Sequence, residues 1–556
     1  MTAKHLHETT CIPGCNAMKP KLSSKAKGHK KMAFTPSFAP TFVTVKEEEA
    51  IATSVVQLGR SCPVFVMKII GLQKPISYLM PLKINLMSTT FRTEHDFLGE
   101  KEVSNNCYYG IQTLRAKDNF DITGIPLSTE PTFIKAFGYV KKAAALANHE
   151  CGVLSKEITE AICYACDRLI AGEFTDQFVS DLIQGGAGTS CNMNVNEVIA
   201  NIGLEKMGHK KGEYQHLHPN NHVNCSQSTN DAYPTAFRMA LYMKIDAFTK
   251  AMEVLQQSFY KKGQEFSGIL KMGRTQLQDA VPMTLGQEFN AFATTIGEDV
   301  LRMSEVQKLI TEVNMGATAI GTGVNAPEGY AVKCVEQLQK ISGIPIVLAA
   351  DLIEATYDTG AYVQLSGTLK RCAVKLSKIC NDLRLLSSGP RCGLNEINLP
   401  PMQPGSSIMP GKVNPVIPEA MNQTCFYVIG ADLTVTLAAE AGQLQLNVME
   451  PVIGFSLFTS LQYLTKACYM LQEKCVDGIT ANPERTREMV MQSIGIVTQL
   501  NPIIGYEASA SMAREALTSG KSIHQLAVVE RKLITQEKWD EIYSIENLIN
   551  PKFINQ

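Results

Sequence analysis

Residues 241–260 read LYMKIDAFTKAMEVLQQSFY, and this stretch decides the fold class. Its apolar residues follow one another at intervals of four and three, and they are Leu241, Ile245, Phe248, Met252, Leu255 and Phe259. That spacing places all six side chains along one face of a helix. The stretch therefore predicts a long amphipathic helix whose apolar face packs against other helices.

Two further stretches repeat the pattern. The second consists of Phe289, Phe292, Ile296, Val300, Met303, Val306, Ile310 and Val313, and the third of Leu369, Cys372, Leu376, Ile379, Leu383 and Leu386. Periods close to 3.5 residues are typical of long helices that pack nearly parallel with a shallow left-handed twist. The chain is therefore predicted to be mainly α, with a long-helix bundle whose apolar stripes can also form contacts between subunits. A shorter helical pattern runs over residues 131–150.

The composition is that of a globular enzyme. The chain has 556 residues, of which 45% are hydrophobic and 19% charged, with a formal net charge of -1. A disordered chain would have fewer apolar residues and a larger net charge. No basic stripe is present for a nucleic-acid partner, and the nearest candidate for a membrane span, residues 64–72, is short and interrupted by Lys68. Nucleic acid and membrane are therefore excluded as partners.

The first 92 residues differ from the remainder. They mix Pro, Ser and Lys with an acidic triplet at 47–49 and show no sustained period, so we interpret them as a poorly ordered extension. Lys-rich stretches such as 19–31 resemble a transit peptide faintly, but almost no Arg is present. We expect a cytoplasmic location, with organellar import as the alternative. Met87 is a candidate for the authentic start.

The 16 cysteines show no paired spacing that would indicate a disulfide framework or a zinc site. The one C-x-x-C pair, Cys163 and Cys166, falls in an apolar stretch that is predicted to be helical. A zinc site would need two further ligands at a second short spacing. Reduced thiols in a reducing compartment fit this distribution best.

Four polar, glycine-rich segments interrupt the apolar pattern. They are GGAGTSCNMN (185–194), HPNNHVNCSQSTND (218–231), GRTQLQDA (273–280) and GSSIMPGKVNP (405–415). None contains a dinucleotide fingerprint, a phosphate-binding loop or an H-E-x-x-H motif, which disfavours nicotinamide, nucleotide and zinc chemistry. The pair His218 and His222 has i, i+4 spacing, but Pro219 and two Asn make a helix unexpected there. No metal ligands are predicted.

The segments share an excess of neutral hydrogen-bond donors and one cation. The donors are Thr189, Ser228, Thr229, Asn230, Thr275, Ser406, Ser407 and Asn414, and the cation is Lys412. Carboxylates accept hydrogen bonds from hydroxyls and amides, and bonds from Lys are stronger because they are charge-assisted. The set therefore suits a small dicarboxylate. Taken singly, each segment is equally well explained as a capped loop.

Residues 405–415 resemble the signature G-S-S-x-M-P-x-K-x-N-P of the aspartase/fumarase superfamily. The resemblance extends from about Glu94 almost to the carboxy terminus, with all four segments in order. It implies a mainly α fold of three domains, at 93–226, 227–481 and 482–556. It also implies a homotetramer in which the central helices form the core and each active site takes its segments from three subunits.

Within the superfamily the sequence resembles aspartases more than fumarases. Gln276 stands where fumarases usually have His, and residues 416–419 (VIPE) are similar to aspartases. Loss of hydroxide from malate requires an acid, which Gln cannot supply, whereas the amine of aspartate leaves from its protonated form. The implied reaction is the reversible conversion of L-aspartate to fumarate and ammonia. The alternatives are a class II fumarase and a catalytically silent binding or structural relative.

The resemblance also implies roles for individual residues. Ser406, as its alkoxide, is the general base that removes a proton from C3 and gives an aci-carboxylate intermediate. Backbone N–H groups of the loop and Lys412 are the available sources of stabilisation for this alkoxide. The β-carboxylate is expected at Thr189, Ser228, Thr229 and Ser407, the α-carboxylate at Thr275, Lys412 and Asn414, and the amine at Asn230. Gln276, Ile408 and Met409 are expected to line the substrate, and Gly405 and Gly411 to act as loop hinges.

A secondary dicarboxylate site is expected at His218, Asn220 and Asn221. Two residues depart from the superfamily pattern there, since relatives often have Asp at Asn221 and Lys at Cys225. No cofactor is required for the implied reaction, and Mg²⁺ activation is suggested by resemblance alone.

Overall fold

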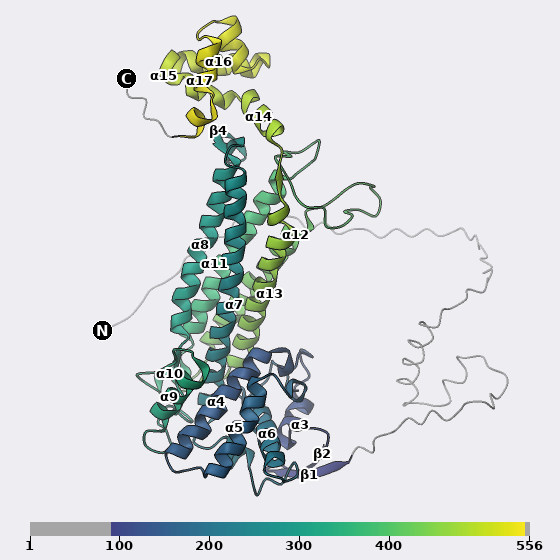
Figure 1. Ribbon diagram of the computed structural model, residues 1–556, viewed down its shortest axis with the longest axis vertical. Coiled ribbons are helices and arrows are strands. Elements are labelled where there is room, and N and C mark those ends of the chain that lie inside the picture. Colours follow the sequence, from purple (N-terminus) through teal and green to yellow (C-terminus); the bar gives the residue numbers. More distant parts are fainter. Residues whose placement is uncertain (1–89, 551–556) are drawn as a thin grey trace, which may run out of the picture. The chain divides into compact units, whose positions relative to one another are not determined.

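Long parallel and antiparallel helices dominate the computed structural model, which describes residues 90–550 (Figure 1). The bundle consists of α7 (Thr229–Glu265), α8 (Leu285–Leu309), α11 (Gly360–Leu386), α12 (Val416–Glu440) and α13 (Glu450–Lys474). Helix α7 packs against α8 and α13, and α11 packs against α8 and α12. The prediction of a mainly α fold with a long-helix bundle is confirmed.

The apolar stripes form the interior of this bundle. All six stripe residues of α7 are buried, and so are all six of α11. A capping box between Ser228 and Asp231 starts α7, and one between Thr284 and Gln287 starts α8. Helix α8 is shorter than the second stripe predicted. It ends at Leu309, and Val313 lies in the short strand β5 (Glu312–Val313). Both Ile310 and Val313 are nevertheless buried.

Shorter helices surround the start of α7. They are α3 (Ile111–Asn119), α4 (Pro131–Glu150), α5 (Lys156–Ile170), α6 (Thr189–Lys206), α9 (Tyr330–Ser342) and α10 (Glu354–Tyr357). Helix α4 covers the whole range predicted for it, and α5 contains both Cys163 and Cys166. The antiparallel hairpin of β1 (Phe91–Asp96) and β2 (Gly99–Ser104) precedes them. Phe91 and Arg92 therefore belong to the folded body, although the extension was expected to reach residue 92, because they pair with Ser104 and Val103.

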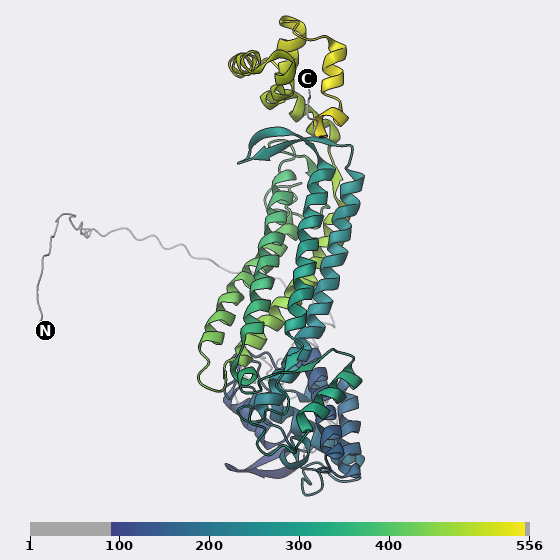
Figure 2. The ribbon, with the colours of Figure 1, turned by 90° about the vertical axis from the view of Figure 1, so that its left-hand side faces the viewer.

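The other end of the bundle has a second, smaller core. The antiparallel hairpin of β3 (Leu270–Thr275) and β4 (Gln278–Thr284) follows α7 and contacts the carboxy-terminal helices (Figure 2). These helices are α14 (Pro483–Gln492), α15 (Asn501–Ile504), α16 (Tyr506–Ser519), α17 (Gln536–Ile542) and α18 (Ile545–Ile549). Leu270 and Met272 of β3 pack in one cluster with Trp539 and Met512. The predicted domain boundaries at 226 and 481 stay predictions.

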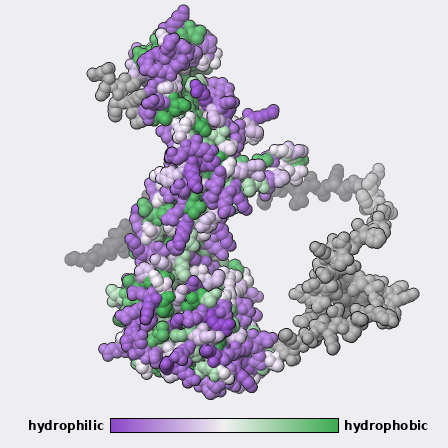
Figure 3. Space-filling model, in the orientation of Figure 1, coloured by the Kyte–Doolittle hydropathy of each residue, from purple (hydrophilic) through white to green (hydrophobic). Residues whose placement is uncertain are grey.

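Three two-residue strands and the molecular surface complete the description. Strand β6 (Val347–Leu348) pairs with β5, and β7 (Ile397–Asn398) pairs with β8 (Thr480–Ala481). Apolar patches lie among the polar residues on the visible face of the long helices (Figure 3). Helix α12 exposes Phe426, Leu433 and Leu437. Among residues 90–550, no helix combines the length and the apolar character needed to cross a membrane.

Candidate active site

The first polar segment forms a tight turn that leads into α6. Gly186, Ala187 and Gly188 all have positive φ angles, of 86°, 54° and 89°. A Cβ atom at Gly188 would lie 2.2 Å from the ring of Tyr233, so no larger residue fits there. Thr189 is the first residue of α6, is exposed, and donates its hydroxyl to Gly186 O at 2.8 Å. It lines an open hollow of about 320 Å³ beside the Asp96–Arg115 ion pair.

The second segment begins α7 and is joined to the first. Ser228 caps the helix, and its hydroxyl accepts a hydrogen bond from Asn230 N at 3.2 Å. The buried Thr229 accepts at Oγ1 from Asn192 Nδ2 of α6, at 3.1 Å. Asn230 donates its amide nitrogen to Ala319 O at 2.8 Å. The start of α7 is therefore held by side chains from α6 and from the loop before α9.

A buried hydrogen-bond hub lies behind this segment. Asn224 Oδ1 accepts from Lys141 Nζ at 2.9 Å, from Asn192 Nδ2 at 3.1 Å and from Asn196 Nδ2 at 3.1 Å. Lys141 is fully buried in α4, and desolvation lowers its pKa to about 7. Sequence reasoning missed Lys141, because a lysine among the alanines of a helix gives no signal that it faces inward.

Asp231 fixes the same segment from another side. Its carboxylate accepts from Ser228 N at 2.9 Å, from Gly316 N at 3.1 Å and from Thr318 N at 3.0 Å. Burial raises the pKa of Asp231 to about 6. The S-x-x-D spacing of Ser228 and Asp231 is the sequence signal that could have identified this role.

The third segment forms the tip of the β3–β4 hairpin. Gln276 and Leu277 are the two turn residues and have φ angles of 54° and 63°, while Thr275 pairs with Gln278. All four are exposed. Left-handed conformations at both turn residues match the right-handed twist of the flanking strands. A cavity of about 310 Å³ lies at the hairpin and is lined by Gln276, Leu277, Arg274 and residues of α11.

The fourth segment is an exposed loop in the long connection between α11 and α12, which stands off the bundle (Figure 1). Ser406 Oγ accepts hydrogen bonds from Ile408 N at 3.2 Å and from Met409 N at 3.0 Å. Two backbone donors on one hydroxyl oxygen are an arrangement that stabilises an alkoxide. Ser407 is exposed, and Ile408 is 84% exposed although it is apolar. No part of residues 90–550 therefore covers the side chains of Ser407 and Ile408.

The two glycines expected to be hinges differ from each other. At Gly405 the beginning of the loop is bonded to its end, since Gly405 N donates to Lys412 O at 2.6 Å and Asn414 Nδ2 donates to Gly405 O at 2.9 Å. A Cβ atom at Gly405 would lie 2.7 Å from Lys412 O, so this position is a close contact rather than a free pivot. Gly411 has a φ of 81° and open space around it. Among residues 90–550, the Lys412 side chain has no hydrogen bond or ion pair.

The four segments lie toward opposite ends of the long helices in one chain. We call Thr189 together with Ser228–Asn230, which hydrogen bonds join, the amino-terminal half-site. The hairpin tip (Thr275, Gln276) and residues 405–414 lie toward the other end, although none of residues 405–414 lines the cavity at the hairpin, and we call the two together the hairpin–loop half-site. The first group lies at the start of α7, and the hairpin follows the end of α7. Since α7 has 37 residues, its ends are about 55 Å apart. One chain therefore cannot bring Thr229 and Thr275 to the same small dicarboxylate.

The segment expected to hold a secondary site forms a short π-helical turn over Pro219–Val223. The expectation that no helix forms there was wrong, because Pro219 takes the first position, where no N–H donor is needed. His218 Nδ1 accepts from Asn220 N at 3.0 Å and from Asn221 N at 3.2 Å, and so caps the turn. Burial lowers the pKa of His218 and of His222. The secondary dicarboxylate site stays a prediction.

Comparison with known proteins assigns the family. A family model described as Lyase matches residues 99–430, and one described as Fumarase C C-terminus matches residues 496–550. The aspartate ammonia-lyase of Pseudomonas fluorescens is 61% identical over 474 residues, which cover 85% of this chain and 99% of the relative.

Two solved structures agree with this assignment. The fumarate lyase:delta crystallin of Brucella melitensis matches with a TM-score of 0.80 and 52% identity, covering 83% of this chain and 99% of that one. The class II fumarase of Schistosoma mansoni matches with a TM-score of 0.78 and 34% identity, covering 82% of this chain and 99% of that one. The chain belongs to the aspartase/fumarase superfamily. It is an enzyme of the lyase class.

Proposed function

We propose that this chain is an aspartate ammonia-lyase, which converts L-aspartate reversibly to fumarate and ammonia. The observation that carries the proposal is the geometry at Ser406, whose Oγ receives two backbone N–H groups within the superfamily signature loop. The choice of aspartate is supported by 61% identity to an aspartate ammonia-lyase, against 34% to a class II fumarase.

The side chain at the hairpin tip supports the same choice. Gln276 is exposed on the turn between β3 and β4, where its neutral amide can donate a hydrogen bond but cannot transfer a proton as an acid. Elimination of water from malate needs such an acid, since hydroxide is a poor leaving group. The ammonium group of aspartate already holds its proton and leaves as neutral ammonia.

In the proposed mechanism, Ser406 acts as an alkoxide and removes one proton from C3 of aspartate. The electron pair of the broken C–H bond moves into the adjacent β-carboxylate, giving the doubly charged aci-carboxylate. This pair then forms the C2–C3 double bond as the C–N bond breaks, and ammonia departs. A serine hydroxyl is almost never deprotonated in water, so its alkoxide must be stabilised by the site. The N–H groups of Ile408 and Met409 supply this stabilisation in the proposed mechanism.

The half-sites supply complementary contacts to the substrate. Thr189, Ser228 and Thr229, with Ser407, hold the β-carboxylate where the new charge develops, and Thr275, Lys412 and Asn414 hold the α-carboxylate. Because the amide nitrogen of Asn230 is bound to Ala319 O, its Oδ1 is the atom left to accept a hydrogen bond from the substrate ammonium group. The unpaired Lys412 ammonium group is available for a carboxylate.

A complete site requires more than one copy of the chain. The length of α7 keeps the two half-sites about 55 Å apart within one chain, so each site combines half-sites from different copies. We propose a homotetramer built on the long helices, where the exposed Phe426, Leu433 and Leu437 of α12 supply apolar contact surface. Isolated monomers are then inactive.

The proposed chemistry uses only protein groups, so no cofactor is required, and Mg²⁺ is proposed as an activator at most. A cytoplasmic location is also proposed. It is supported by the cysteines of residues 90–550, all of which are free, as expected in a reducing compartment.

The function is tested by following fumarate absorbance with purified protein and either L-aspartate or L-malate. We expect turnover of aspartate, and turnover of malate that is slower by about 100-fold or more because no acid serves the hydroxyl group. Faster turnover of malate than of aspartate would overturn the proposal in favour of a fumarase. Binding of fumarate without turnover of either substrate would indicate a catalytically silent relative.

A further inference from the structure

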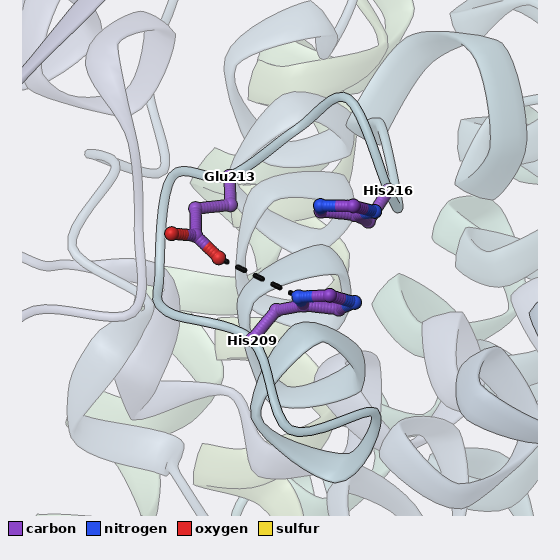
Figure 4. A group of neighbouring side chains, drawn as sticks. All are labelled: His209, Glu213 and His216. Atoms are coloured by element: carbon purple, nitrogen blue, oxygen red, sulfur yellow. Dashed lines mark ion pairs between the residues drawn. The ribbon is translucent and has the colours of Figure 1, made fainter.

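Three side chains with metal-binding groups meet in the loop that follows α6. They are His209, Glu213 and His216, and their nearest ligand atoms all lie within 4.8 Å of one another. The two imidazole rings stack with centroids 3.7 Å apart and planes 5° from parallel, and the carboxylate of Glu213 lies beside them (Figure 4). His209 Nδ1 and Glu213 Oε2 are 3.6 Å apart.

The backbone of this loop is fixed from within the fold. Gly208 and Gly212 have φ angles of 84° and 86°, which turn the chain sharply on either side of His209. His209 N donates to Leu204 O at 2.9 Å, and Gly212 N donates to Asn201 Oδ1 of α6 at 2.8 Å. His216 N donates to Glu213 O at 3.1 Å. The backbone positions of the three residues are therefore set by a built turn.

The nearby lysines do not occupy the cluster. Lys211 Nζ lies 4.1 Å from the centroid of the Tyr108 ring and 4.0 Å from Glu205, and Lys206 Nζ lies 4.9 Å from the centroid of the Tyr164 ring. The backbone N–H of Lys210 donates to Glu213 Oε2 at 3.0 Å, which holds this oxygen toward His209, and a carboxylate oxygen has a second lone pair for an ion. The ammonium groups of Lys206 and Lys211 therefore lie against other residues than the three of the cluster.

The donor set selects the class of ion. Two imidazoles and one carboxylate suit zinc, nickel, cobalt or copper, whereas Mg²⁺ and Ca²⁺ take oxygen ligands almost exclusively. The lone pair of each ligating nitrogen lies in its ring plane, so both rings must rotate out of the stack to point at one ion. His216 is exposed and His209 is half-buried, which leaves room for that rotation.

We propose that His209, Glu213 and His216 bind one divalent transition-metal ion of the zinc class, with water in the remaining positions. The loop joins α6, which begins at Thr189, to the π-helical turn and the start of α7. A bound ion therefore fastens the connection between the two segments of the amino-terminal half-site and raises the melting temperature of the protein. The proposal rests on the donor set and does not depend on which substrate the enzyme uses.

The test is calorimetric titration of Ni²⁺ into the full-length protein, previously treated with a chelator. Three proteins are compared: the natural chain, His209→Ala/His216→Ala, and the control His95→Ala, which removes an exposed histidine from strand β1. We expect the natural chain and the control to share a site of one ion per chain that the double variant binds at least tenfold more weakly. Excess Mg²⁺ should not displace Ni²⁺ from it.

Folding and stability give the second readout. Circular dichroism and the melting temperature without metal should be nearly the same for all three proteins, because none of the substituted histidines is buried. Added Zn²⁺ should raise the melting temperature of the natural chain and of His95→Ala, but not of the double variant. Equal Ni²⁺ affinity in the double variant and the natural chain would overturn the proposal, and so would the absence of a one-to-one site in the natural chain.

Discussion

The amino-terminal half-site and the hairpin–loop half-site are built in opposite ways. Thr229 is buried, and its segment is held by a capping box, by Asn192 and by the carboxylate of Asp231, which accepts three backbone hydrogen bonds. Ser406 lies in an exposed loop whose hydrogen bonds are local to the loop. One half-site is organised before substrate arrives, whereas the loop of the other holds Ser406 by hydrogen bonds within the loop.

This difference fits the role proposed for the loop, which is to supply the base. A preorganised surface binds a carboxylate at low reorganisation cost, whereas a loop that contacts only itself can close on a substrate held by another copy. Substitutions in the first half-site should therefore change both stability and substrate affinity. Substitutions in the loop should change turnover with little effect on folding.

The largest effect is expected for Ser406→Ala. It removes the proposed base and should lower kcat by about 10²- to 10⁴-fold, while the melting temperature stays unchanged because the hydrogen bonds of the Ser406 hydroxyl within residues 90–550 lie inside its own loop. Steady-state kinetics with aspartate and thermal unfolding measure the two quantities. Gln403→Ala, in the exposed loop beside it, is the matched control and should behave like the natural chain. Turnover within a factor of two of normal in Ser406→Ala would rule out the base.

Asn224→Ala should change the stability of the fold and the affinity for substrate, whereas Ser406→Ala changes turnover. It removes the acceptor that Lys141, Asn192 and Asn196 share, and although Asn192 still donates to Thr229 and Lys141 to Gln227, loss of an acceptor at a buried donor costs about 1–3 kcal/mol. We expect a fall in the free energy of unfolding by at least that amount and a rise in KM for aspartate. Denaturant unfolding and steady-state kinetics check this, with the exposed Asn106→Ala as control. An unchanged unfolding free energy would show that the hub does not hold the half-site.

Two glycine substitutions compare the half-sites directly. Both Gly188 and Gly411 have positive φ, but a Cβ atom at Gly188 would meet Tyr233 at 2.2 Å, and one at Gly411 would meet nothing within 4 Å. Gly411→Ala should therefore cost only the conformational strain of about 1–2 kcal/mol, and Gly188→Ala should cost roughly 1–3 kcal/mol more through overpacking. Equal destabilisation of the two variants, measured by denaturant unfolding, would contradict the claim that Gly188 is tightly packed and Gly411 is not.

The smallest effect concerns the pH dependence of stability. The pKa of Lys141 is lowered to about 7 in the folded chain, so between pH 7 and its ordinary value of 10.5 the unfolded chain holds a proton that the folded chain lacks. Stability due to this group must then rise with pH. The difference in unfolding free energy between the natural chain and Lys141→Met should increase by roughly 1–2 kcal/mol from pH 7 to pH 9. A difference that falls or stays constant would show that Lys141 keeps its charge.

Periodicity predicted the bundle well because burial of one helix face is a repeating requirement. The stripes of α7 and α11 and the full length of α4 could be read from spacing alone. The early end of α8 could not, since Ile310 and Val313 stay buried after the helix stops and so continue the apolar pattern. The turn at Pro219 also escaped prediction, because its cap is a histidine side chain.

The candidate site was predicted in part. The polar segments and the loop could be found because small and polar residues interrupt an apolar background. The buried hub around Asn224 and the cluster of His209, Glu213 and His216 could not, since both depend on tertiary contacts or turns that leave no spacing rule. Sequence reasoning also gave no distance between segments, which the 37 residues of α7 supply.

The central claim, that each site combines half-sites from different copies, is tested most directly by mixing two inactive variants. Thr229→Val damages one half-site and Ser406→Ala the other, and the two proteins are unfolded, mixed in equal amounts and refolded together. Random hybrids should regain activity in roughly a quarter of their sites, where both half-sites are natural. Variants refolded separately and then mixed serve as the control and should stay inactive. No recovery in the co-refolded mixture, with natural protein refolding to full activity, would contradict the account.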